Sequence, residues 1–473
     1  MGSCKLATQT PGTRREVGEV SGFLLRRRQP VLRVGTAALL MLVPLSDRLS
    51  AMATSTAIAP QTLPITSHLA MRLRSHVDYL ASQALRGRKP GTPGNRMAAE
   101  YIAARFREAD LEPLPSLGGY GQQISPQLGD NLIGVRRALN AGDPSHRSPR
   151  WILIGAHYDH LGGTYLGADD NASAIAILIE TARSLPHLAN HPVLFMAFNA
   201  EEPPYIRTPL MGSQFFVDHL PVEIGTPSRL QAVIVMDLMG GVHWEPLRDV
   251  IFAAGAEKSP GLYGRVKEVS REASLLKREA SIASSRGASL ATDTTTQRHE
   301  RRDTPHALRV LPIGMHLIEE IPLVGQVSFS DYDAFRNASV PFLFLSAGRT
   351  PRYHQPTDLP DTLHYERMAW TVGWFQSLVT QMDQDTEPYP FEATRVELAD
   401  EAASLRPFVS LAAAWATRIP GTSPLSLARM KLDDRWLRTL DVTAPMSGAL
   451  KRLERVSIRL QCLLADFPAC FLI

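Results

Sequence analysis

The sequence has little cysteine, no long apolar run and no marked excess of charge of one sign. Three cysteines among 473 residues cannot build a disulfide framework. No Cys–His cluster is present, so a metal site in this chain must use imidazole and carboxylate ligands. Apolar residues make up 44% and charged residues 21% of the chain, which is ordinary for a globular protein. The length indicates one large domain with additions.

The positive charge is concentrated at the N-terminal end. Residues 1–53 carry eight basic and three acidic side chains, a net charge of +5, which leaves −2 for the remainder of the chain. That remainder gives no indication of a nucleic-acid partner. Within the first segment, basic residues Arg26 to Arg28 precede the apolar run Val34–Leu45, and small residues follow at Ala51–Ala53. This order is typical of a secretory leader.

We therefore expect residues 1–53 to direct export, to the medium or to the periplasm and cell envelope. The apolar run is too short for a comfortable membrane span, so we expect no span in the mature chain. An uncleaved signal anchor is the alternative. In an oxidising compartment Cys462 and Cys470 could pair.

Short apolar segments alternate with amphipathic ones after residue 67, which predicts an α/β fold. The sheet is expected to be mixed and mostly parallel, with helices on both faces. The predicted strands cover residues 131–135, 151–156, 193–199, 232–236 and 342–346. Apolar stripes between residues 67 and 106 predict two helices separated by a break rich in glycine and proline.

We predict a catalytic domain over residues 67–385 and a helical C-terminal extension over residues 388–473. Residues 271–306 are rich in Ser, Arg, Thr and Glu, which favours a flexible insertion within the domain. In the extension, apolar residues recur at the spacing of amphipathic helices.

Polar side chains gather after the ends of the predicted strands. In an open α/β sheet, ligands bind beyond the carboxyl ends of the strands. The residues there, and in the loop after the strand at 151–156, are imidazole and carboxylate groups: His157, Asp159, Asp169, Asp170, Glu201, Glu202, Asp237 and His354. Each alone has an ordinary explanation, such as a solvated face or a helix cap. Together they would bury many like charges, which is costly without cations, so we predict a metal centre.

An ordered set of motifs also resembles a known family. The motifs are Leu85-Arg86-Gly87-Arg88, Gly91-Thr92-Pro93-Gly94, Asn131-Leu132-Ile133-Gly134, His157-Tyr158-Asp159, the stretch from Gly167 to Ser173, Ala200-Glu201-Glu202, Met236-Asp237 and the stretch from Tyr353 to Asp358. Over about residues 67–380 the chain is similar to the di-zinc aminopeptidases of metallopeptidase family 28, clan MH. That family includes bacterial leucyl aminopeptidases and glutamate carboxypeptidase-like enzymes. The resemblance implies a zinc-exopeptidase fold.

The resemblance also implies two Zn²⁺ ions and their ligands. His157 and Asp237 would bind one ion, Glu202 and His354 would bind the other, and Asp170 would bridge both. The implied partner is a peptide with a free N-terminus, whose first residue is hydrolysed off.

Two further roles follow from the same resemblance. Glu201 would be the general base that acts on a zinc-bridged water. Asp159 would hold His157 through its second ring nitrogen, which fixes the tautomer of a ligand imidazole.

Some departures and alternatives remain. Ala174 replaces a usual glycine, the residues 203–210 lengthen the turn after the glutamate pair, and the 271–306 insertion lengthens the route from Asp237 to His354. A glutaminyl cyclase-like acyltransferase with one zinc, or a non-catalytic binding module on the same fold, are the competing hypotheses. The complete ligand set favours the two-metal hydrolase over both. Carboxypeptidase or deacylase activity stays open at this point.

Overall fold

The computed structural model describes residues 67–140, 150–272, 308–321, 325–415, 424–443 and 446–464. They belong to one unit of the chain, Pro60–Ile473. The leader predicted over residues 1–53 and nearly all of the insertion predicted over residues 271–306 lie outside the described residues, as do Cys470 and the side chain of Cys462. The boundaries of the catalytic domain and the C-terminal extension stay predictions.

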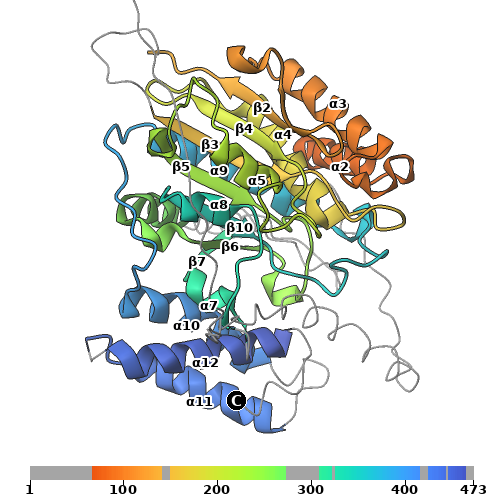
Figure 1. Ribbon diagram of the computed structural model, residues 1–473. Coiled ribbons are helices and arrows are strands. Elements are labelled where there is room, and N and C mark those ends of the chain that lie inside the picture. Colours follow the sequence, from red (N-terminus) through yellow and green to blue (C-terminus); the bar gives the residue numbers. More distant parts are fainter. Residues whose placement is uncertain are drawn as a thin grey trace, which may run out of the picture. The chain divides into compact units, whose positions relative to one another are not determined.

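An eight-stranded sheet forms the centre of the described chain (Figure 1). Its strands lie in the order β1-β2-β4-β3-β5-β10-β6-β7. Their bounds are Gly121–Ser125 (β1), Gly129–Arg136 (β2), Trp151–His157 (β3), Val193–Phe198 (β4), Leu230–Met236 (β5), Val250–Ala254 (β6), Arg309–Ile313 (β7) and Phe342–Ser346 (β10). β4, β3, β5 and β10 pair in parallel, as do β6 and β7, while β1–β2, β2–β4 and β10–β6 are antiparallel. The predicted mixed, mostly parallel sheet is confirmed.

Side chains on the central strands alternate between two apolar cores, one on either face of the sheet. In β3, Ile152 and Ile154 face one core and Leu153 faces the other. The first core is covered by α2 (His68–Leu80), α3 (Pro93–Glu108), α4 (Ala174–Ser184), α9 (Tyr365–Met382) and a helix over residues 260–272. The second is covered by α5 (Gly212–Asp218), α7 (Met315–Glu319), α8 (Tyr332–Asn337), α10 (Leu398–Trp415), α11 (Pro424–Thr439) and α12 (Met446–Leu464). Helices therefore cover both faces, as the sequence predicts.

The last three helices pack on one another and on the end of the sheet at β7. In Figure 1 they form the blue layer below α7. The Ser457 hydroxyl and the Gln461 amide of α12 both donate to the carbonyl of Leu317 in α7, at 2.6 and 2.8 Å. Among the described residues, no helix is both long enough and apolar enough to cross a membrane.

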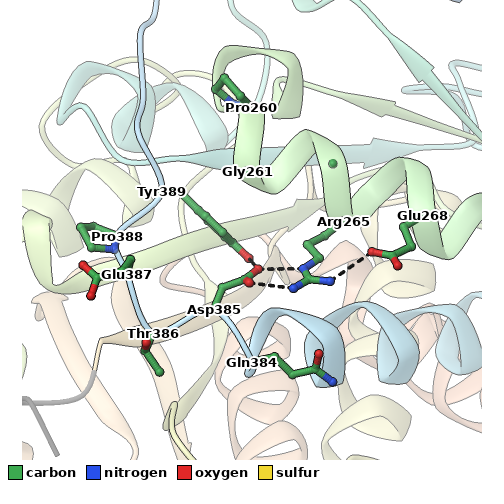
Figure 2. Close-up of a pocket in the computed structure, with 11 residues that line it drawn as sticks. Pro260, Gly261, Arg265, Glu268, Gln384, Asp385, Thr386, Glu387, Pro388 and Tyr389 are labelled. Carbon is green, nitrogen blue, oxygen red and sulfur yellow. Dashed lines mark hydrogen bonds and ion pairs between the residues drawn. The ribbon is translucent and has the colours of Figure 1, made fainter.

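A pocket of about 600 Å³ lies where α9 leads into the C-terminal segment. Figure 2 shows Arg265 and the Tyr389 hydroxyl both directed at Asp385. Two guanidinium nitrogens of Arg265 donate to the two oxygens of Asp385 at 2.7 and 2.8 Å, and Tyr389 donates to the same carboxylate at 2.7 Å. These contacts tie the helix over residues 260–272 to the chain after α9. None of the lining residues is a predicted site residue, so we assign this pocket a structural role.

Replacing Arg265 with Met should lower the free energy of unfolding by about 1–3 kcal/mol, because a partly buried, charge-assisted pair is lost. The hydrogen bonds from Arg265 and Tyr389 hold the pKa of Asp385 below its usual range. The contribution is therefore fully present above about pH 4 and is lost as the pH falls through the lower pKa of the folded state. Urea unfolding of both proteins at several pH values measures this. If the free energies of unfolding of the two proteins differed by the same amount at pH 7 and at pH 2, this role of the Arg265–Asp385 pair would be contradicted.

Candidate metal centre

The predicted site residues meet at the carboxyl edge of the parallel strands. His157 is the last residue of β3, Asp237 follows β5 directly, and the glutamate pair follows β4 after two residues. His354 lies in the loop after β10, and Asp170 lies in the helical turn η3 (Ala168–Ser173) that precedes α4. Because parallel strands end at the same edge, residues far apart in the chain come together there.

One group of ligand atoms surrounds the imidazole of His157. Its Nε2 atom lies 3.4 Å from Asp170 Oδ1 and 3.5 Å from Asp237 Oδ1. The second oxygen of Asp237 accepts a hydrogen bond from the Ser330 hydroxyl at 3.0 Å, which leaves the first oxygen to face His157. His157, Asp170 and Asp237 are all buried and can offer one ligand atom each to a common cation.

A second group lies on the other side of Asp170. His354 Nε2 is 3.2 Å from Asp170 Oδ2 and 3.1 Å from Glu202 Oε2. The two oxygens of Asp170 thus face different groups, so this carboxylate is placed to serve both. The arrangement holds together all five residues that the sequence predicts as ligands.

His160 is a further member of the second group that the sequence analysis does not predict. Its Nδ1 atom lies 2.7 Å from Glu202 Oε1 and 3.8 Å from Asp170 Oδ2. The ring is fully buried and meets the His354 ring edge-on, with centroids 5.7 Å apart. Gly167 makes room for it, because a Cβ at that residue would lie 2.6 Å from the His160 ring. The available indication was the run His157-Tyr158-Asp159-His160, with a second imidazole one residue after Asp159.

The adjacent glutamates face different groups. Glu201 Oε2 lies 3.8 Å from His157 Nε2, whereas both oxygens of Glu202 face histidines of the second group. Ala200 before them has a left-handed backbone with φ of 58°, an uncommon conformation for a residue other than glycine. The bent chain places one carboxylate beside each group.

Burial and the neighbouring carboxylates of Glu202, Asp237 and Asp331 raise the pKa of Glu201 well above its usual range, although His157 opposes the shift. A carboxyl group with a raised pKa and a position beside the ligand cluster is suited to accept and return a proton. Bound cations would oppose the shift, because positive charge favours the ionised form.

Asp159 contacts His157 in a way that differs in detail from the expectation. The Nδ1 atom of His157 is 3.2 Å from the main-chain oxygen of Asp159 and 3.8 Å from its carboxylate. The carboxylate instead accepts the amide N–H groups of Glu201 and Glu202, at 3.1 and 3.2 Å. Asp159 therefore orients His157 through the main chain and holds the glutamate pair through its side chain.

The donor set fits zinc. Among the described residues, buried atoms without a hydrogen-bond partner include His157 Nε2, Asp170 Oδ2, Asp237 Oδ1, His160 Nε2 and His354 Nε2. Each unpartnered buried polar atom costs about 1–3 kcal/mol, so their accumulation at one place indicates cation ligands. Ligand atoms of a tetrahedral zinc site with bonds near 2.0–2.1 Å lie about 3.3 Å apart, and the spacings here are 3.1–3.5 Å.

The chain is similar to proteins of Escherichia coli strain K12. It is 26% identical over 238 residues to the uncharacterized protein YfbL of Escherichia coli strain K12, which covers 47% of this chain and 64% of that protein. It is 28% identical over 135 residues to the alkaline phosphatase isozyme conversion protein of the same organism, covering 24% of this chain and 38% of that protein. The matches thus span less than two thirds of the length of either relative.

Some solved structures are similar to this chain, at low sequence identity. They include LapB from Legionella pneumophila, with a TM-score of 0.45, 19% identity and coverage of 69% of this chain and 78% of that one. For BSAP, a zinc aminopeptidase from Bacillus subtilis, the TM-score is 0.44 and the identity 16%, and the match covers 69% of this chain and 98% of that one. For a Porphyromonas gingivalis glutaminyl cyclase, the TM-score is 0.44 and the identity 17%, and the match covers 67% of this chain and 100% of that one.

The family model described as peptidase family M28 matches residues 138–376, just over half of the chain. The matched region begins after β2 and ends within α9, so it contains β3, β4, β5 and β10 and every residue of the two ligand groups. The chain belongs to peptidase family M28.

Proposed function

We propose that this protein is an exported aminopeptidase that uses two zinc ions to remove the N-terminal residue of a peptide. The observation that carries the proposal is the position of Asp170, whose two oxygens lie 3.4 Å from His157 Nε2 and 3.2 Å from His354 Nε2. A carboxylate shared in this way suits a pair of cations a few ångströms apart. Export enters the proposal from the composition of residues 1–53.

Two zinc ions, when bound, supply an acidified water and a polarised scissile carbonyl. Glu201 is positioned to accept the proton of the attacking water at its carboxylate, and then to donate that proton to the nitrogen of the leaving amine. Asp159 holds the main chain at Glu201 and Glu202, so the base and the ligand keep fixed positions relative to each other. His157 presents its Nε2 lone pair, because its Nδ1–H is engaged by the main chain of Asp159.

The charge of the site favours the amino end of a peptide. Asp159, Asp170, Glu201, Glu202 and Asp237 are all buried within it. When all five are ionised, these carboxylates carry one negative charge more than two divalent cations neutralise. A free α-ammonium group is attracted to such a site, and a free α-carboxylate is repelled. This supports aminopeptidase activity over carboxypeptidase activity.

We predict two zinc ions per chain and loss of hydrolysis on treatment with a chelator, with recovery when zinc is returned. The reason is that the ligand atoms form two groups that share Asp170. Metal analysis of the purified protein, paired with activity during stepwise zinc addition, measures this. Full hydrolytic activity with one tightly bound zinc would contradict the two-metal mechanism.

Glu201→Gln should keep both zinc ions and lose about 10²–10⁴-fold in kcat, because the proton acceptor is gone while the ligands remain. Glu202→Gln is the matched control, since it changes the adjacent residue in the same way and should instead weaken zinc binding. A panel of aminoacyl anilides with free and with blocked amino groups provides the rates. Hydrolysis of the blocked compounds at similar rates would exclude an aminopeptidase, and near-normal turnover by Glu201→Gln would refute the role of the base.

A further inference from the structure

The segment Leu166–Asp170, which ends at the shared ligand Asp170, is held on its main chain by two ionic side chains. The carbonyls of Leu166 and Gly167 accept hydrogen bonds from the Arg88 guanidinium at 2.7 and 2.9 Å. The amides of Asp169 and Asp170 donate to the Asp358 carboxylate at 2.9 and 3.1 Å. Within this five-residue segment, the Arg88 cation thus binds two carbonyls and the Asp358 anion binds two amides.

Both side chains are deeply buried, each about 1% exposed. The guanidinium of Arg88 also donates to the carbonyls of Leu80 and Tyr158. None of the acceptors of Arg88 is a carboxylate, although burial of a charge is costly unless it is well partnered. Negative charges of the site itself, among them Asp170 and Asp358, interact electrostatically with Arg88.

The chain is bent to bring Arg88 to this position. Arg86, Gly87 and Arg88 all have left-handed backbone, with φ of 46°, 68° and 49°. This conformation is unfavourable for residues with a Cβ. At Gly87 a Cβ would lie 2.1 Å from the main-chain oxygen of Tyr165, so the turn lies directly against the start of the held segment. The strained turn indicates that the inward position of Arg88 is structurally required.

The two side chains connect loops that carry ligands. Tyr158, bound by Arg88, stands between His157 and Asp159 at the end of β3. Asp358 lies four residues after His354 on the same loop. Through these contacts the main chain at Asp170 is fixed relative to the loops of His157 and His354.

We infer that Arg88 and Asp358 are positioning residues of the metal centre, which hold Asp170 between its two groups. The inference rests on the proposed zinc function, but neither residue is a ligand in it. Partners that hold metal ligands in place commonly change metal affinity 10–100-fold when they are replaced. In Asp358→Asn, an amide N–H₂ would face N–H donors of the main chain, so at least one of these hydrogen bonds is lost.

The chain offers matched controls at the opposite end of the strands. Asp383 accepts the amides of Ala189, Asn190 and His191 at 2.8–3.0 Å, just before β4 begins. Arg136 is buried and donates to two carbonyls, those of Ala109 and Ala182. These residues make the same kinds of contact as Asp358 and Arg88 without touching a loop that carries a ligand.

The experiment compares Asp358→Asn with Asp383→Asn, and Arg88→Lys with Arg136→Lys. The dissociation constant for zinc is measured by competition with a chromogenic chelator, and thermal unfolding of the metal-free proteins is recorded alongside. We expect Asp358→Asn and Arg88→Lys to weaken zinc binding 10–100-fold. We expect the two controls to lower the unfolding temperature but to keep the wild-type zinc affinity. Asp358→Glu retains the negative charge, so it should bind zinc more tightly than Asp358→Asn. It replaces Asp358→Asn in the comparison if that variant fails to fold.

Wild-type zinc affinity in Asp358→Asn and Arg88→Lys would overturn the inference. Equal losses of affinity in the two controls would also overturn it, because general destabilisation would then explain the effect. A wild-type protein that binds no zinc would instead overturn the proposed function. The readout is metal binding, so it does not depend on identifying the preferred peptide.

Discussion

The concentration of buried carboxylates at one edge of the sheet is the constraint on which the rest of the site depends. Asp159, Asp170, Glu201, Glu202 and Asp237 lie there with little access to water, and Coulomb repulsion between them is weakly screened. Buried like charges are tolerated where cations or hydrogen-bond donors compensate them. The imidazoles of His157, His160 and His354 face the same carboxylates, so the arrangement fits divalent cations.

A second consequence is that carboxylates not assigned as ligands are used to fix the main chain. Asp159 binds two successive amides after β4, Asp358 binds two in the turn η3, and Asp169 binds the amides of Gly240 and Gly241 after β5. Each of these pairs is a charge-assisted contact between loops from different strands. The loops are therefore cross-linked at several points, and the side chains of the proposed ligands extend from a main chain that is already held. Such support is the usual requirement for precise metal geometry.

Much of this architecture can be predicted from the sequence, because the apolar strands and the polar residues that follow them are local features of the chain. Apolar runs identify β3, β4, β5 and β10, and the polar residues that follow them identify most of the site. The predicted set of strands omits β1, β6 and β7. β1 is mostly polar and β7 contains Pro312, and both form strands through pairing with their neighbours, which a local pattern does not encode. β6 is an apolar run that no predicted site residue follows, so the strand-and-site pattern does not identify it.

Contacts between loops are the part that the sequence does not reveal. The role of Asp358 depends on which amides lie opposite its carboxylate, and that of Arg88 depends on a left-handed turn beneath the site. His160 could be noted as a second imidazole after β3, but its place beside Glu202 follows only from the folded loop. The orientation of His157 by the main chain of Asp159, with the carboxylate turned to other partners, is likewise a three-dimensional fact.

The shared position of Asp170 is the central claim, and it is tested most directly by anomalous diffraction at the zinc edge from crystals of the zinc-loaded protein. We expect two peaks about 3.5–4 Å apart with Asp170 between them. His157 and Asp237 should lie at one peak, and Glu202 and His354 at the other. A single peak, or two peaks that do not share Asp170, would contradict it.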